Sequence, residues 1–309
     1  MNIDIAKNVE LAPQTTFKIG GKADFFASVS SKQGLNEALD FSRKNELDFF
    51  VFSGGSNILF SDKGFRGLVI KIENKKIELA GEEIYAEAGV VLSQLVKFSA
   101  ENSLAGLEWA AGIPGSVGGA IRGNAGAFGG EMKDNLLEAE VFDTEKNEFL
   151  ILKNEECGFA YRESLMKRKN NLIIISARFK LKKGNQEEIQ NKIKEIIAKR
   201  TQNQPSGFSA GSFFKNPIVK DEKIIEKFEH DKEIKMRGDK LPAGWFIEDL
   251  GLKGKKMGGA QVSEQHGNFI INTGEATAED VIILSSFLKQ KVRDSYGVQL
   301  EEEVCLVGF

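Results

Sequence analysis

Hydrophobic positions in the first quarter of the chain switch between helical spacing and short unbroken runs. Residues 33–45 carry Leu35 and Leu39 among polar residues, the spacing of an amphipathic helix. Continuous apolar runs follow at 49–52 and 68–72. Short apolar runs that alternate with helices are typical of parallel-type strands covered on both faces. The sequence therefore predicts an α/β arrangement for this part of the chain.

From about residue 75 the pattern becomes rich in strands. The pattern predicts strands at 84–88, 137–142, 148–152 and 172–181, and helices at 92–102 and 187–200. Residues 202–207 have the composition of a linker. The remainder is predicted as α+β and ends in a helix whose capping box pairs Thr277 with Asp280. These changes predict three parts, at 1–74, 75–201 and 202–309, with the last few residues free to pack back on the first two.

Composition excludes several classes of protein. The 309 residues include 42 basic and 45 acidic ones, for a net charge of −3, so nothing favours a nucleic-acid partner. No apolar run reaches 18 residues, so we expect no membrane insertion. Cys157, Cys305, His230 and His266 stand in no metal-type spacing, so no metal site is expected. Two cysteines far apart in the sequence imply no disulfide scaffold, so we expect the protein in the reducing cytoplasm. We also expect a monomer.

A glycine-rich segment at 106–130 is the first candidate for binding chemistry. It holds nine of the chain's 32 glycines, and glycine lets backbone N–H groups converge on an anion. A flexible linker is the alternative, but a linker would not interleave Trp109, Ile113 and Val117 among its glycines. Neither GxGxxG nor GxxxxGK[ST] occurs in the chain, so the common nucleotide motifs are ruled out.

A second segment, Ser53–Asn57, directly follows the apolar run at 49–52. It is rich in N–H and hydroxyl donors, which suits a pyrophosphate at the carboxyl end of a strand. A plain tight turn is at least as good a reading of this segment alone. Together the two segments predict one dinucleotide site. The predicted cofactor-binding residues are Ser53, Gly54, Gly55, Ser56, Asn57, Gly112, Ile113, Pro114, Gly115, Ser116, Gly118, Gly119, Ala120, Asn124, Gly126 and Ala127.

Several motifs coincide, in order and with suitable spacing, with those of one enzyme family. They are TFKIGG at 16–21, SGGSNILFSD at 53–62, IPGSVGGA at 113–120, YRES at 161–164, AGSFFKNP at 210–217 and LEEEV at 300–304. In these residues the chain resembles the MurB family, the UDP-N-acetylenolpyruvoylglucosamine reductases of peptidoglycan synthesis. The resemblance implies a mixed α+β fold, in which a vanillyl-alcohol-oxidase-type FAD-binding module of two α/β subdomains precedes an α+β substrate-binding domain. It also implies NADPH as reductant and UDP-N-acetylglucosamine enolpyruvate as substrate.

Two details follow from residues that these segments lack. The glycine-rich segments contain neither His nor Cys, so FAD is expected to bind non-covalently. The chain's three tyrosines are Tyr85, Tyr161 and Tyr296, and none lies within 163–211. We therefore interpret the chain as the type II form of the family, which lacks a tyrosine-bearing loop over the UDP portion.

The resemblance assigns three catalytic residues. Arg162 is the expected clamp for the substrate carboxylate, since guanidinium offers a rigid fork of donors. A surface ion pair with Glu163 or Glu156 is the alternative. Ser212 resembles the family's proton donor, although from the residues alone a turn-capping serine is the better reading.

Glu303 is the third, because it matches the glutamate before Val in the family's terminal motif. Alternation along a strand puts Glu301 and Glu303 on one face and Glu302 on the other, and the resemblance selects Glu303. A buried carboxyl there could be held protonated or could steer the charge of an intermediate.

Further residues are expected to bind substrate, and two other functions compete. The expected substrate-binding residues are Tyr161, Lys215 and Asn216, whereas Trp245 is expected in the core. One rival is a related flavoprotein oxidase that acts on an alcohol. The other is a non-catalytic nucleotide-sugar-binding protein that keeps the same scaffold.

Overall fold

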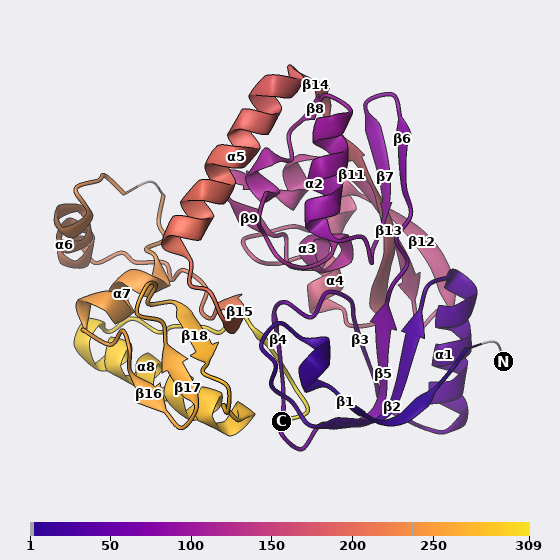
Figure 1. Ribbon diagram of the computed structural model, residues 1–309, viewed down its shortest axis with the longest axis horizontal. Helices are drawn as coiled ribbons and strands as arrows, with labels where there is room; N and C mark the ends of the chain where they lie inside the picture. The colour runs from indigo at the N-terminus through magenta and orange to yellow at the C-terminus, as the bar shows by residue number, and fades with distance from the viewer. Residues whose placement is uncertain (1–2, 237) are drawn as a thin grey trace. The chain divides into compact units, whose positions relative to one another are not determined.

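The computed structural model describes residues 3–236 and 238–309 (Figure 1). The chain forms two compact units, and each is assembled from separate stretches of sequence. The first unit comprises the chain up to Val9, Ala23–Gly55 and Arg66–Gln202, and the second comprises Glu10–Lys22, Ser56–Phe65 and Asn203–Phe309. The three parts predicted from the sequence are contiguous blocks, unlike these two units, and that division stays a prediction.

A four-stranded sheet lies at the start of the first unit. Its strands, in spatial order, are β1 (Ala6–Glu10), β2 (Lys22–Val29), β5 (Phe65–Ile72) and β3 (Phe49–Phe52). β3 and β5 run parallel, with Phe49 opposite Leu68, as the apolar runs predict. Helix α1 (Lys32–Lys44) begins where the Ser31 hydroxyl accepts a hydrogen bond from the Gly34 amide at 3.0 Å. It buries Leu35 and Leu39, so the predicted helix is confirmed.

A five-stranded sheet forms the larger part of the first unit. Its spatial order is β12 (Glu148–Lys153), β11 (Leu136–Asp143), β13 (Leu172–Lys180), β7 (Glu83–Glu87) and β6 (Ile77–Ala80). Every neighbouring pair is antiparallel, and all four predicted strands are confirmed. The buried residues of β13 and β7 belong to one core with those of α2 and α3.

Helices and short elements complete the first unit. They are α2 (Leu92–Glu101), α3 (Val117–Arg122), α4 (Leu165–Arg168), α5 (Gln186–Asn203), β8 (Leu104–Ala105), β9 (Gly126–Ala127), β10 (Gly130–Glu131), β14 (Lys182–Lys183) and the 3-10 turns η2 (Glu108–Ala110), η3 (Met132–Asp134) and η4 (Asn154–Cys157). The predicted linker at 202–207 is wrong in its first two residues, because α5 runs on through Asn203. Polar residues can continue a helix, so composition alone does not reveal where α5 ends.

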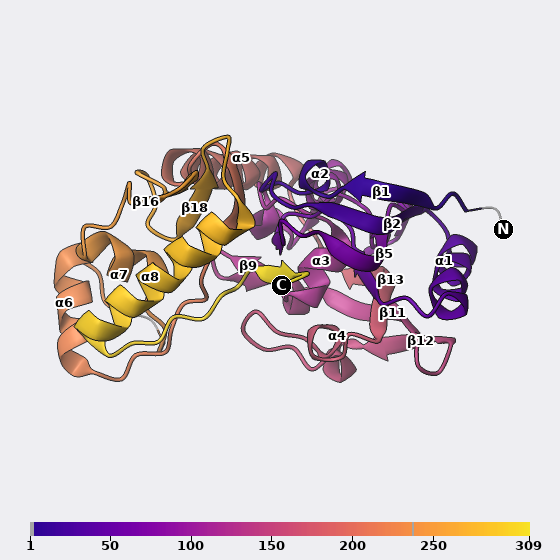
Figure 2. The same ribbon diagram turned by 90° about the horizontal axis from the view of Figure 1, so that it is seen from below.

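The second unit is built on a small antiparallel sheet beside helices. The strands, in order, are β15 (Phe208–Ser212), β18 (Phe269–Asn272), β17 (Ala260–Val262) and β16 (Lys256–Met257), and the helices are α6 (Glu222–Lys232), α7 (Ala243–Asp249), α8 (Ala278–Tyr296) and the short turn η1 (Ala12–Gln14). α8 contacts β16 and β17, and Figure 2 shows it running beside this sheet. Trp245 is 3% exposed in the core of this unit, as expected.

Segments far apart in sequence are joined within the second unit. β19 (Cys305–Val307) pairs in parallel with β4 (Ile58–Phe60), close to the chain's end. The predicted capping box of α8 is present, since the Asp280 amide donates to the Thr277 hydroxyl and the Thr277 amide donates to the Asp280 carboxylate. The Asp62 carboxylate adds two bonds at the same helix end, from the amides of Ala278 at 2.9 Å and Glu279 at 3.1 Å. Across residues 3–236 and 238–309, no helix has the length and apolar character needed to cross a membrane.

Candidate active site

The two predicted cofactor-binding segments meet in the first unit. A Cβ atom added to Gly54 would lie 2.8 Å from Cα of Gly115 and 3.0 Å from the backbone nitrogen of Ser116. Only glycine permits so close an approach of two backbones. Gly55, Gly112 and Gly115 also have positive φ, at 62°, 75° and 118°. The two loops therefore form one cradle of backbone groups, which fits the pyrophosphate of FAD.

The start of α3 contributes less to this cradle than a helix N-terminus usually would. The Ser116 side chain caps the helix by accepting a hydrogen bond from the Gly119 amide at 3.3 Å. The amides of Val117 and Gly118 donate to the carbonyls of Val90 and Ala88, at 2.8 and 2.9 Å. These two N–H groups are consequently not available to an anion. Donors for a phosphate must come from the loops that precede the helix.

Asn124 shapes the loop that follows α3. Its side chain is fully buried, and its Nδ2 donates to the Glu131 carboxylate at 2.9 Å and to the Ala160 carbonyl at 3.0 Å. Its Oδ1 accepts from the Lys133 amide at 3.1 Å. Burial alone would raise the pKa of Glu131, but hydrogen bonds from Lys133 and Asn124 outweigh it and leave the pKa lowered. The Asn124 side chain therefore supports the loop, and its place in the cofactor site stays a prediction.

The other predicted cofactor-binding residues surround these positions. The Ser53 hydroxyl donates to the Ile72 carbonyl at 2.9 Å, which fixes the end of β3. Ile113, Ser56, Gly126 and Ala127 are half-buried, Asn57, Pro114 and Gly119 are exposed, and Gly118 and Ala120 are buried. Ser56 and Asn57 belong to the second unit, and the others belong to the first.

Arg162 is held at the edge of the same glycine-rich segment. Its Nη2 donates to the Gly126 carbonyl at 2.9 Å, and its guanidinium lies over the Tyr161 ring, 5.3 Å from the centroid. Arg162 has a φ of 56°, which is uncommon for a residue other than glycine. The Lys167 ammonium donates to the Arg162 carbonyl at 2.7 Å and lies 3.4 Å from the Glu163 carboxylate. The strained backbone thus has local support at a candidate site.

Sequence reasoning missed a second arginine at this segment. Arg200, near the end of α5, is half-buried and lies over the Phe128 ring, 5.2 Å from the centroid. A Cβ atom on Gly112 would lie 2.8 Å from Arg200 Cδ. Burial lowers the pKa of Arg200, and the nearby charge of Arg162 lowers it further. The only signal in the sequence is that a predicted helix ends in arginine. Two guanidinium groups thus lie close to the glycine-rich segment.

In the second unit, Ser212 and Glu303 lie on neighbouring stretches of backbone. Ser212 ends β15 opposite Phe269 of β18, after a bulge that includes Gly211 at a φ of 78°. The next residue, Phe213, accepts a hydrogen bond at its carbonyl from the Glu303 amide at 2.8 Å. The Asn57 side chain donates to the Glu303 carbonyl at 3.1 Å. Two of the predicted catalytic residues are thereby brought into one region.

The three consecutive glutamates near the C-terminus have different surroundings. The side chain of Glu301 is 72% exposed and lies 3.5 Å from the Lys215 ammonium. Both carboxylate oxygens of Glu302 accept from Lys289 of α8, at 2.9 and 3.1 Å. Glu303 is half-buried. Burial therefore separates Glu303 from the exposed Glu301 but not from Glu302, which is also half-buried, and the choice of Glu303 stays a prediction.

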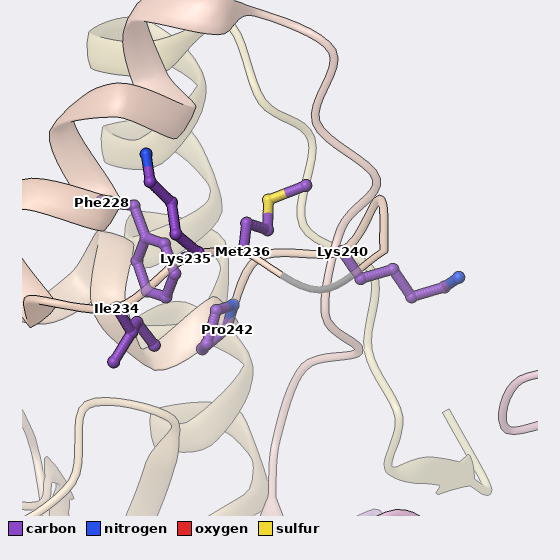
Figure 3. A pocket seen from close by; sticks show the side chains of 6 residues that line it. All are labelled: Phe228, Ile234, Lys235, Met236, Lys240 and Pro242. Carbon is purple, nitrogen blue, oxygen red and sulfur yellow. The ribbon is translucent and has the colours of Figure 1, made fainter.

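Asn216 and a nearby cavity belong to the same unit. Oδ1 of Asn216 accepts from the Ala243 amide at 3.1 Å, at the start of α7. The cavity, of about 560 Å³, is lined by Phe228, Ile234, Lys235, Met236, Lys240 and Pro242 (Figure 3). Lys235 pairs with Glu229 and Lys240 with Asp239. Because the lining is mostly apolar and both cations have carboxylate partners, the cavity identifies no ligand by itself.

Comparison with known proteins agrees with the cradle and with the second unit. A model of the FAD binding domain matches residues 23–150, and a model of the UDP-N-acetylenolpyruvoylglucosamine reductase C-terminal domain matches residues 202–307. The reductase of that name from Caldanaerobacter subterraneus subsp. tengcongensis is 41% identical over 303 residues, which cover 97% of this chain and 93% of that protein. The chain belongs to the UDP-N-acetylenolpyruvoylglucosamine reductase family.

Other members of the reductase family support the assignment. The Syntrophomonas wolfei reductase is 40% identical over 308 residues, covering 97% of this chain and 94% of that protein. The crystal structure of the Thermus caldophilus reductase (MurB) matches with a TM-score of 0.78 and 33% identity, covering 99% of both chains. The predicted fold is confirmed, and so is the prediction of an oxidoreductase that uses FAD. The type II form stays a prediction.

Proposed function

We propose that this chain uses NADPH to reduce the enolpyruvyl ether of UDP-N-acetylglucosamine to UDP-N-acetylmuramate, a step of peptidoglycan synthesis. Ser212 and Glu303 carry the proposal, because they lie on hydrogen-bonded segments within the unit that the reductase C-terminal model matches. When bound, FAD would supply the hydride transfer from NADPH to the outer carbon of the enolpyruvyl group, in a ping-pong order with the two substrates bound in turn. The loops at 53–55 and 112–116, which meet in the first unit, would hold the cofactor non-covalently.

Arg162 would bind the carboxylate of the substrate. Hydride addition leaves negative charge on the system conjugated with that carboxylate, and a fixed cation stabilises such charge. The bond to the Gly126 carbonyl and the support from Lys167 fix the position of the guanidinium before substrate arrives. Tyr161, whose ring lies against Arg162, would line the same site.

Ser212 would donate the proton that completes the reduction. A serine hydroxyl is a weak acid, so this role requires a strongly basic carbon centre and little water. The carboxyl of Glu303 would steer the charge of the intermediate from a neighbouring backbone segment. Lys215 and Asn216 would contact the diphosphate or sugar.

The test separates the two half-reactions by stopped-flow absorbance of the flavin. With wild type, NADPH should bleach the flavin and the UDP-enolpyruvyl sugar should restore its colour. Ser212→Ala should keep the bleaching rate and slow recolouring by about 10² to 10⁴. Arg162→Ala and Glu303→Ala should act in the same direction. Ser206→Ala, an exposed serine just before the same strand, is the control and should leave both rates unchanged.

The same experiment distinguishes the rival functions. Recolouring of Ser212→Ala by the sugar at the wild-type rate would remove Ser212 as proton donor. Bleaching of the wild-type flavin by an alcohol, with oxygen restoring its colour and no response to the sugar, would instead identify the oxidase. A protein purified without flavin absorbance would favour the non-catalytic binding protein.

A further inference from the structure

A buried asparagine next to Ser212 has no role in the reaction proposed above. Asn268, immediately before β18, is 4% exposed. Its Oδ1 accepts from the Phe214 amide at 2.9 Å, and its Nδ2 donates to the Phe214 carbonyl at 2.8 Å. The carbonyl of Asn268 also accepts from the Phe213 amide at 2.8 Å. One residue thus fixes three backbone groups within two residues of Ser212.

The position of Asn268 coincides with a change of strand partner. Up to Ser212, β15 pairs with β18, and beyond it Phe214 pairs with Glu302. Between these two pairings, the Asn268 carboxamide bonds to both the amide and the carbonyl of Phe214. It thereby offers one donor and one acceptor, as a residue of a neighbouring strand would. Leaving a buried backbone group without a partner is costly, so this side chain fixes the path of 212–214 strongly.

We propose that Asn268 is a positioning residue for proton transfer, which holds the Ser212 hydroxyl where it can reach the substrate. The inference rests on the proposed function, since it concerns the step assigned to Ser212. Asn268 itself touches neither reactant in this account. Its effect passes through the backbone of Phe213 and Phe214, which connects Ser212 to the segment that carries Glu303. Small displacements at a reacting group are costly, up to roughly a hundredfold for about 1 Å.

Asn272, the last residue of β18, offers a matched control. It is 6% exposed, its Nδ2 donates to the Phe17 carbonyl at 3.1 Å, and its Oδ1 accepts from the Gly274 amide at 2.8 Å. It therefore makes the same kind of buried bonds to backbone but lies opposite Phe208, at the far end of β15 from Ser212. Replacement by aspartate keeps the size of each side chain and removes the Nδ2 donor.

The experiment compares Asn268→Asp and Asn272→Asp in the flavin-loaded protein, by flavin half-reactions and by thermal unfolding. Both variants should unfold at lower temperature than wild type. Only Asn268→Asp should slow recolouring by the UDP-enolpyruvyl sugar, by roughly ten- to a hundredfold, while NADPH bleaching keeps its wild-type rate. A larger solvent-deuterium isotope effect on recolouring should accompany the slowing, because proton transfer becomes more rate-limiting.

Three outcomes would overturn the inference. Wild-type recolouring by Asn268→Asp would do so, and so would equal slowing in Asn268→Asp and Asn272→Asp, which marks a purely structural role. Slowing of bleaching and recolouring alike would also contradict it. If wild type itself is not recoloured by the sugar, the proposed function fails instead, and the two failures are thereby distinguished. Should Asn268→Asp not fold, Asn268→Ser supplies the same comparison.

Discussion

The contact between Gly54 and Gly115 gives the sharpest prediction about the cofactor site. In Gly54→Ala the new methyl carbon would lie 2.8 Å from Cα of Gly115, and the other near atoms are also backbone. Ordinary carbon contacts begin at about 3.5 Å, so the two loops must separate by about 0.7 Å. No flexible side chain can move aside to relieve this clash.

The free-energy cost follows from this overlap. Overpacking of a tight contact costs about 1–3 kcal/mol. If FAD requires the loops at their original separation, its binding must restore the clash, and Kd for FAD rises roughly five- to a hundredfold. The assay is fluorescence titration of the apoprotein with FAD, together with urea unfolding of the apoprotein. Gly34→Ala is the control, because Gly34 is helical and its added Cβ would meet only ordinary contacts of 3.4 Å or more.

The result that would refute this reasoning is a specific pair of observations. If Gly54→Ala binds FAD with the wild-type Kd, the loops do not grip the cofactor as a pair. If its unfolding free energy is also unchanged, the backbones do not touch as described. A loss of stability without a loss of affinity would retain the contact but remove it from the cofactor site.

Two other predictions concern the second unit. Asp62→Ala removes two bonds and a negative charge at the start of α8, so the unfolding free energy should fall by about 1–2 kcal/mol in urea titration, whereas exposed Lys63→Ala should change little. Burial, with added repulsion from Lys232 and Lys253, lowers the pKa of His266 below its usual 6.5. The unfolded chain therefore binds this proton more readily, and stability present above pH 6.5 is lost as the pH falls towards the folded pKa. Urea titrations at pH 7.5 and 5.5 should show a smaller loss in His266→Gln than in wild type, and an equal loss would contradict the prediction.

Much of the fold could be predicted because periodicity reports burial directly. The helix at α1 and the strands at β11 and β13 bury residues at the spacing that their hydrophobic patterns predict. The capping box of α8 was also readable, since Thr277 and Asp280 are local to one another. Local chemistry of this kind needs no knowledge of distant partners.

Features that depend on distant partners could not be predicted. β19 is three residues long and pairs with residues about 250 positions earlier. The hydrophobic pattern of neither segment predicts this pairing. Nothing in the sequence distinguishes Asn268 from other asparagines, because its role depends on bonds to the distant Phe214 backbone. Asn124 is a further case, because its bonds to Glu131, Ala160 and Lys133 join segments that no local pattern relates.

The parallel pairing of β19 with β4 also has a consequence for synthesis on the ribosome. Leu59 and Phe60 of β4 are fully buried in the finished protein and are made early, yet their strand partner is made some 250 residues later. At about 5–20 residues per second, these apolar side chains wait on the order of tens of seconds for it. The nascent first unit must fold around a hydrophobic insertion that it cannot cover itself. We therefore expect the nascent chain to need chaperones during translation even if the finished enzyme is stable.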